Sequence, residues 1–215
     1  MVDDDSQIHE LDRKIAFAVF SFLAGVLSIL LVFVSIRSLA ERQSTIAGNP
    51  SAYILTAIVI LVWAVFSIPH VIALGTMLSP KSNSFALAAT ILSSIGILLL
   101  GFGIFMHAGA RLSILSAGKP ADSADAAYQL AIWTNLGYYL TDPGLMTWGF
   151  GQLLFGWLAW RSRVLPNWLA IVGIVGGLAG LLTLAVYQSP ALALFQISAF
   201  AIWGIVTGII LIRRK

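Results

Sequence analysis

Long apolar segments separated by short polar ones repeat along the whole chain. The first runs from Ile15 to Ile36 without a charged side chain, and the pattern returns until Ile212. An α-helix needs about 20 apolar residues, with a range of roughly 17–25, to cross the hydrocarbon core of a bilayer. Six segments meet this length: residues 15–36, 53–78, 85–107, 143–160, 165–187 and 191–212. The pattern therefore predicts an all-α integral membrane protein, a bundle of six transmembrane helices in a single domain over residues 1–215.

The composition indicates the same environment. Charged residues make up 10% of the chain and hydrophobic residues 59%, and the mean hydropathy is +0.94. A soluble protein of this size could not cover so much apolar surface with so few charges, so the lipid bilayer is an expected partner. Cysteine is absent, which excludes disulfides and thiolate catalysis. A net charge of +3 gives no indication of a nucleic-acid partner.

Proline marks the start of several predicted helices. A capping side chain before proline suits a helix start, because the first-turn N–H has no partner within the helix. Three predicted spans begin at such a pair: Asn49-Pro50, Asp142-Pro143 and Ser189-Pro190.

The segment before the fourth span is irregular. Residues 123–140 are apolar but contain polar positions such as Asn135. They predict an amphipathic interfacial helix that turns into the membrane at Thr141-Asp142. The alternative is one long kinked helix from 123 to 160, which is less favoured because a residue before proline is biased away from α geometry.

The distribution of Lys and Arg predicts the orientation, since cytoplasmic loops carry an excess of both. An inward N-terminus places eight of the 12 basic residues on the cytoplasmic side: Arg13, Lys14, Lys81, Arg161, Arg163, Arg213, Arg214 and Lys215. The outer side keeps the remaining four: Arg37, Arg42, Arg111 and Lys119. Both termini are therefore expected in the cytoplasm.

Small residues recur at four-residue spacing in the last two spans. This spacing lets helix backbones approach closely within a membrane. The glycines concerned are Gly173, Gly176, Gly177 and Gly180 in the fifth span and Gly204 and Gly208 in the sixth. We expect a closely packed hairpin of these two spans within one chain, with a homodimer face as the alternative.

Polar side chains inside spans are costly and are therefore the first candidates for function. His70 follows Pro69 in the second span, while Gln152 and Gln196 lie in the fourth and sixth. The three residues form a possible ligand site or polar path. The alternative is that His70 is a neutral hydrogen-bonding residue and that the glutamines join helices. Asp142 is expected to cap the fourth span, with a proton relay as the alternative role.

No cofactor is required by the sequence. His70 and His107 fall at different depths, so the two are not expected to bind one haem iron, although His70 alone could bind haem or a pigment. No metal-ligand spacing and no constellation of acid, base and nucleophile is present. We expect no catalytic residues, no metal site and no enzymatic activity.

The segment WRSRVLPNWLA, residues 160–170, precedes the glycine-rich run from Gly173 to Gly180. Together they resemble the signature loop of a family of uncharacterised bacterial six-span membrane proteins, catalogued as a domain of unknown function. The resemblance implies a six-helix fold in the bacterial cytoplasmic membrane and implies no activity. In physical terms, Arg161 and Arg163 hold the cytoplasmic side, and Trp168 anchors the next helix at the interface.

The sequence thus favours a non-enzymatic integral membrane protein. Its role would be that of a structural or accessory subunit, with other membrane subunits or further copies as partners, or of a binder of a hydrophobic ligand within the bundle. The alternative is a small secondary transporter or channel built around His70, Gln152 and Gln196. The absence of a detectable inverted repeat speaks against a transporter.

Overall fold

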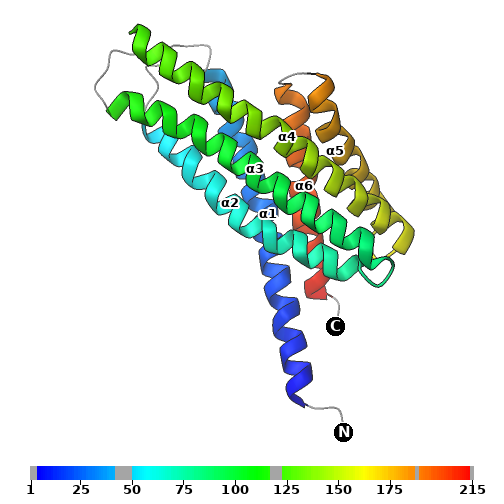
Figure 1. Cartoon of the computed structure of the whole chain (residues 1–215). Coiled ribbons are helices and arrows are strands. Elements are labelled where there is room, and N and C mark those ends of the chain that lie inside the picture. Colours follow the sequence, from blue (N-terminus) through cyan, green and yellow to red (C-terminus); the bar gives the residue numbers. More distant parts are fainter. Residues whose placement is uncertain (1–3, 42–49, 117–122, 187–188, 214–215) are drawn as a thin grey trace.

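The computed structural model describes residues 4–41, 50–116, 123–186 and 189–213. These residues form six α-helices packed side by side (Figure 1), with no strand among them. The helices are α1 (Asp4–Glu41), α2 (Pro50–Leu78), α3 (Asn83–Ser116), α4 (Ala124–Ser162), α5 (Asn167–Ala185) and α6 (Pro190–Arg213). The predicted all-α fold is therefore confirmed.

Four helices are long and apolar enough to cross a membrane. The qualifying stretches are Leu11–Phe33 in α1, Ile54–Leu78 in α2, Asn83–Ile114 in α3 and Pro190–Arg213 in α6. In α5, Asn167–Thr183 is apolar but shorter, and α4 is not among the four. The chain thus has the helices of a membrane protein, and α2 and α6 begin at the prolines that were predicted to start them.

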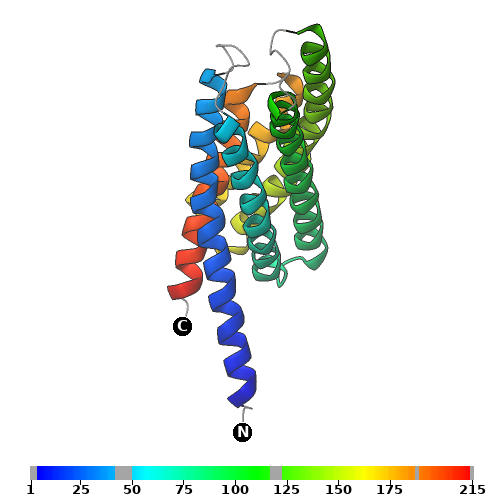
Figure 2. The ribbon, with the colours of Figure 1, turned by 90° about the vertical axis from the view of Figure 1, so that its left-hand side faces the viewer.

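The helices differ in how extensively they contact one another. The most extensive contacts join α3 to α4, α4 to α5 and α1 to α6, whereas α5 and α6 contact each other less. The first helix therefore packs along the last one, and its N-terminal part extends beyond the other helices (Figures 1 and 2). The expected close hairpin of the last two helices is not the main contact of either.

The prediction of two elements over residues 123–160 is wrong, because α4 is one helix with Pro143 inside it. Pro143 removes one backbone donor. Continuous packing against α3 outweighs this local cost: a Cβ built on Gly144 would lie 2.7 Å from the backbone nitrogen of Leu100. Five residues before Asp142, a Cβ built on Gly137 would lie 2.6 Å from Nε2 of the His107 ring on α3.

The two ends of α4 are capped by Ser123 and Arg163, and not by Asp142, which was expected to cap the start of the fourth span. Ser123 is the N-cap, and its Oγ accepts a hydrogen bond of 3.2 Å from the backbone N–H of Ala126. Arg163 closes the helix in the left-handed conformation at φ 54°, and its N–H donates to the carbonyl of Ala159. Asp142 therefore lies inside the helix, so its predicted role as an N-cap is wrong.

Glycines create close contacts between helix backbones, which we call the glycine contacts. A Cβ built on Gly177 would lie 2.6 Å from the backbone nitrogen of Leu153 and 2.7 Å from the carbonyl oxygen of Gly149, both on α4. A Cβ on Gly204 would lie 2.7 Å from the backbone nitrogen of Gly25, on α1. Gly208 meets the same helix at Ala18 and Phe22. The glycines of α6 thus face α1, in place of the expected approach to α5.

Candidate functional site

Four buried rings meet where α2, α4 and α6 come together, and we call them the central cluster: Trp63, His70, Trp148 and Phe200. Each ring is at most 3% exposed. The Phe200 ring lies 4.9 Å from Trp148, 5.1 Å from His70 and 6.3 Å from Trp63, centroid to centroid, in edge-to-face geometry. Trp63 and Trp148 are 5.5 Å apart. Edge-to-face packing places the positive ring edge on the negative face of its neighbour, which stabilises such a group.

Two serines of α1 bind the polar edges of this cluster. Nδ1 of His70 and Oγ of Ser21 lie 2.8 Å apart and share a hydrogen bond. Nε1 of Trp63 donates to Oγ of Ser28 at 2.7 Å, and that hydroxyl donates to the carbonyl of Ala24. Residues seven apart share a helix face. The spacing of Ser21 and Ser28 could therefore have identified both as candidate site residues from the sequence.

The two glutamines lie against α5. A Cβ on Gly176 would lie 2.7 Å from Nε2 of Gln152, and a Cβ on Gly180 would lie 2.6 Å from the side-chain amide of Gln196. Glycine at these positions therefore makes room for the amides. Gln196 comes from α6, one turn before Phe200, and its Nε2 donates to the carbonyl of Leu145 at 3.1 Å.

Several polar atoms in and beside the central cluster have no hydrogen-bond partner in the described part of the chain. They are Nε2 of His70, Nε1 of Trp148, both amide atoms of Gln152 and Oε1 of Gln196. A buried polar atom without a partner costs about 1–3 kcal/mol, so each one in a native protein calls for an explanation. The concentration of donors and acceptors beside aromatic rings is what a ligand site uses for orientation.

The structure thus brings three of the four predicted polar residues to one region. Gln152 lies one turn after Trp148 on α4, and it shares the space beside Gly176 with Ala199, the neighbour of Phe200. His70 and Gln196 adjoin Phe200 from α2 and α6. Asp142 is partly exposed and makes no described contact with the central cluster.

The two membrane histidines pack in different places. The ring of His107 lies 4.7 Å from Tyr138, on the N-terminal half of α4, whereas His70 packs on Phe200. Binding of a large flat pigment or haem to His70 would require Phe200 to move. Among the described residues, no group of three or more His, Asp and Glu side chains lies close enough together to hold a metal ion.

Comparisons with known proteins bear on the family and not on the site. No curated protein and no solved structure matches the chain. One family model matches residues 15–214, and its description is "Domain of unknown function (DUF4386)". The match covers all six helices except the start of α1, and it confirms the resemblance drawn from residues 160–180. The chain belongs to the DUF4386 family of domains of unknown function.

Proposed function

We propose that this chain is a non-enzymatic, six-span protein of the bacterial cytoplasmic membrane that binds a small lipophilic molecule at the central cluster. The observation that carries the proposal is the set of unpartnered donors and acceptors beside four rings packed edge to face. Both termini face the cytoplasm in this proposal, and α4 and α5 complete the six spans.

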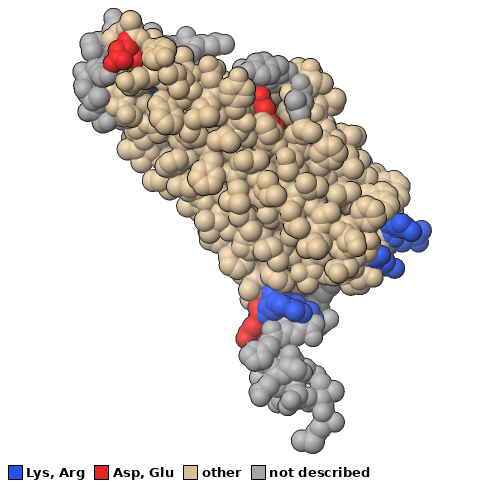
Figure 3. Space-filling view, viewed as in Figure 1, with Lys and Arg blue, Asp and Glu red and all other residues tan. Residues whose placement is uncertain are grey.

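The surface supports a lipid environment. Large apolar side chains are exposed around the bundle, among them Val65 at 62%, Phe102 at 62% and Ile212 at 68%. A monomeric soluble protein rarely exposes apolar surface on this scale, whereas hydrocarbon covers it without cost. In Figure 3 the middle of the molecule is almost free of charge, and the visible Lys and Arg side chains lie at its lower end. Along the sequence, the assignment of eight basic residues to the inner side and four to the outer side supports an inward N-terminus.

The chemistry of the central cluster defines the class of ligand. Trp63, Trp148 and Phe200 offer flat apolar contact, Nε1 of Trp148 and Nε2 of Gln152 can donate, and Oε1 of Gln196 can accept. A hydrophobic molecule with a carbonyl or hydroxyl group matches these features. Because the rings are buried, binding requires Trp148 and Phe200 to move apart.

The test is to purify the full chain from native membranes in mild detergent and to identify co-purified small molecules by mass spectrometry. We expect one lipophilic species near equimolar amount, reduced at least tenfold in Gln152→Leu. Trp168→Phe, which changes an exposed indole on α5, is the matched control and should retain it. Equal amounts in wild type and Gln152→Leu, or no bound species in folded wild type, would refute ligand binding at this site and leave a purely structural or accessory role.

Membrane orientation has its own test. Reporter fusions at Gly48 and Ala121 should read extracytoplasmic, and fusions at Asn83, Ser162 and the C-terminus should read cytoplasmic. A cytoplasmic signal at Ala121 would overturn either the count of six spans or the orientation.

A small transporter or channel is the second candidate function. It is favoured by one observation: His70, Gln152 and Gln196 come from three helices and adjoin the same part of the core. Proton-coupled uptake by vesicles containing the purified chain, lost in a folded His70→Ala variant, would establish this candidate against the first.

A further inference from the structure

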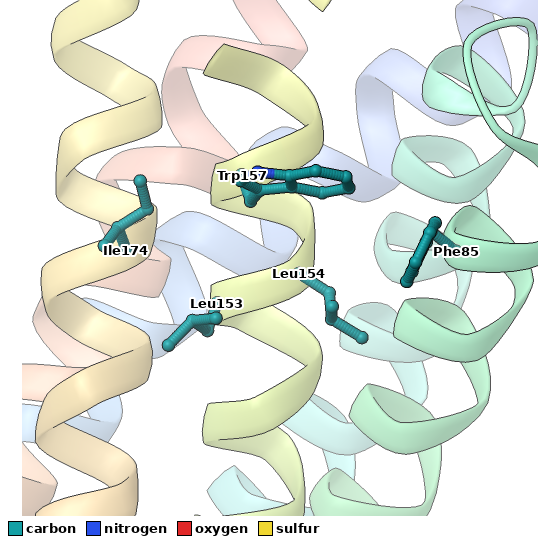
Figure 4. A pocket seen from close by; sticks show the side chains of 5 residues that line it. All are labelled: Phe85, Leu153, Leu154, Trp157 and Ile174. Carbon is teal, nitrogen blue, oxygen red and sulfur yellow. The ribbon is translucent and has the colours of Figure 1, made fainter. Parts of the chain in front are cut away.

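An apolar groove opens between α3, α4 and α5, away from the central cluster. Five hydrophobic side chains line it: Phe85, Leu153, Leu154, Trp157 and Ile174 (Figure 4). The space measures about 350 Å³. The rings of Phe85 and Trp157 pack edge to face, with 5.3 Å between their centroids. Because α4 contributes Leu153, Leu154 and Trp157, the groove runs along the last part of this helix.

Basic side chains stand at one end of this groove. The guanidinium carbon of Arg161 lies 5.5 Å from the centre of the Trp157 ring, one helical turn nearer the end of α4. A cation over an indole face is attracted by the ring quadrupole, so Trp157 holds Arg161 beside the groove. Lys81 is exposed and precedes Phe85 by four residues, where α2 connects to α3.

We propose that the groove binds an acyl chain of an anionic phospholipid, with the phosphate held by Arg161. The inference rests on the membrane placement given under the proposed function. Hydrocarbon fills an apolar groove that faces the bilayer, and the positive end selects a negatively charged headgroup. Basic sites between helices on the cytoplasmic side are known to recognise such headgroups.

The dimensions agree with this arrangement. Leu153 precedes Arg161 by eight residues, a rise of about 12 Å along α4. A phosphate at Arg161 therefore leaves the upper part of an acyl chain beside Trp157, Leu154 and Leu153 in turn. Arg161 also presents a planar set of donors that suits phosphate oxygens.

Native mass spectrometry of the full chain, released from nanodiscs of equal phosphatidylglycerol and phosphatidylcholine, tests the proposal. We expect wild type to retain one phosphatidylglycerol in preference to phosphatidylcholine. Arg161→Gln should lower this preference at least fivefold. Leu153→Trp fills the groove and should abolish retention of phosphatidylglycerol. Arg213→Gln is the matched control, because it removes one exposed positive charge at the end of α6 and should keep the preference.

Several results would overturn the lipid site. They are an equal loss in Arg161→Gln and Arg213→Gln, full retention in folded Leu153→Trp, or no preference in wild type. A dimer mass that disappears in Leu153→Trp would assign the groove to a second copy of the chain instead. Circular dichroism and gel filtration of each variant exclude misfolding. A nanodisc offers the same lipids in both leaflets, so the result does not depend on the orientation of the chain. The central ligand is measured in a separate experiment, so failure of this site is distinguishable from failure of the proposed function.

Discussion

The glycine contacts and the central cluster differ in how the helices pack against one another. At the glycine contacts, backbones meet directly, as where Gly177 of α5 meets Gly149 and Leu153 of α4. At the central cluster, large rings of α2, α4 and α6 pack against one another, and polar atoms of Trp148 and Gln152 have no partner in the described chain. Close backbone packing is sufficient to associate helices in lipid. The unpartnered polar atoms of the cluster are the features on which the proposed ligand site depends.

The largest effect is expected at the glycine contacts. Gly177→Leu should abolish folded protein, because its Cβ would overlap backbone atoms of α4 that cannot move aside. We expect a loss above about 3 kcal/mol, the upper range for overpacking. The measurement is the yield of monodisperse protein by gel filtration.

Gly109→Leu is the control for this change, because nothing lies within 4 Å of a Cβ at Gly109. It should fold. If Gly177→Leu folded and changed only the oligomeric state, the assignment of this contact to a single chain would be wrong.

An intermediate effect is expected for His70→Ala. The change removes a buried ring and its hydrogen bond with Ser21, and it should cost about 1–3 kcal/mol. Thermal unfolding in one detergent measures the loss. The double variant with Ser21→Ala isolates the hydrogen bond, for which about 0.6 kcal/mol of coupling is typical inside membranes. Purely additive losses would show that the hydrogen bond contributes nothing to stability.

The smallest effects on stability are expected at the two glutamines, and Gln196→Leu should cost more than Gln152→Leu. Gln152→Leu breaks no described hydrogen bond, so it should leave stability unchanged or slightly raised. Gln196→Leu breaks the bond to the carbonyl of Leu145 and should cost about 0.6 kcal/mol. Thermal unfolding of both variants provides the comparison. A larger loss in Gln152→Leu would mean that its amide serves packing, and the central cluster would then contribute to stability as the glycine contacts do.

The apolar pattern was sufficient to predict an all-helical chain and the positions of α1, α2, α3, α5 and α6, because each helix must present hydrophobic side chains wherever it faces lipid or core. It could not predict that α4 is continuous. The bias of the residue before Pro143 is local, whereas the packing of Gly137 and Gly144 on α3 depends on residues far away in the chain. Spacing likewise revealed a small-residue face at Gly204 and Gly208 but not which helix would cover it.

The candidate site was predictable only in part. His70, Gln152 and Gln196 stand out because polar residues are rare in apolar spans. Phe200 does not stand out, since aromatic residues are common in such segments, and its central place follows from the crossing of α2, α4 and α6. Asp142 was misassigned because its expected role depended on a helix start that does not exist.

The pairing of α1 with α6 has a consequence for biogenesis. During synthesis Gly25 leaves the ribosome long before its partner Gly204, and at roughly 5–20 residues per second the interval is on the order of ten seconds or more. Until α6 arrives, the small-residue face of α1 has no covering helix from this chain. Ser21 can already bind His70 of α2, so α1 and α2 can associate first. Packing of α6 against α1 then closes the bundle, so these helices can reach their described arrangement only after α6 has been synthesised.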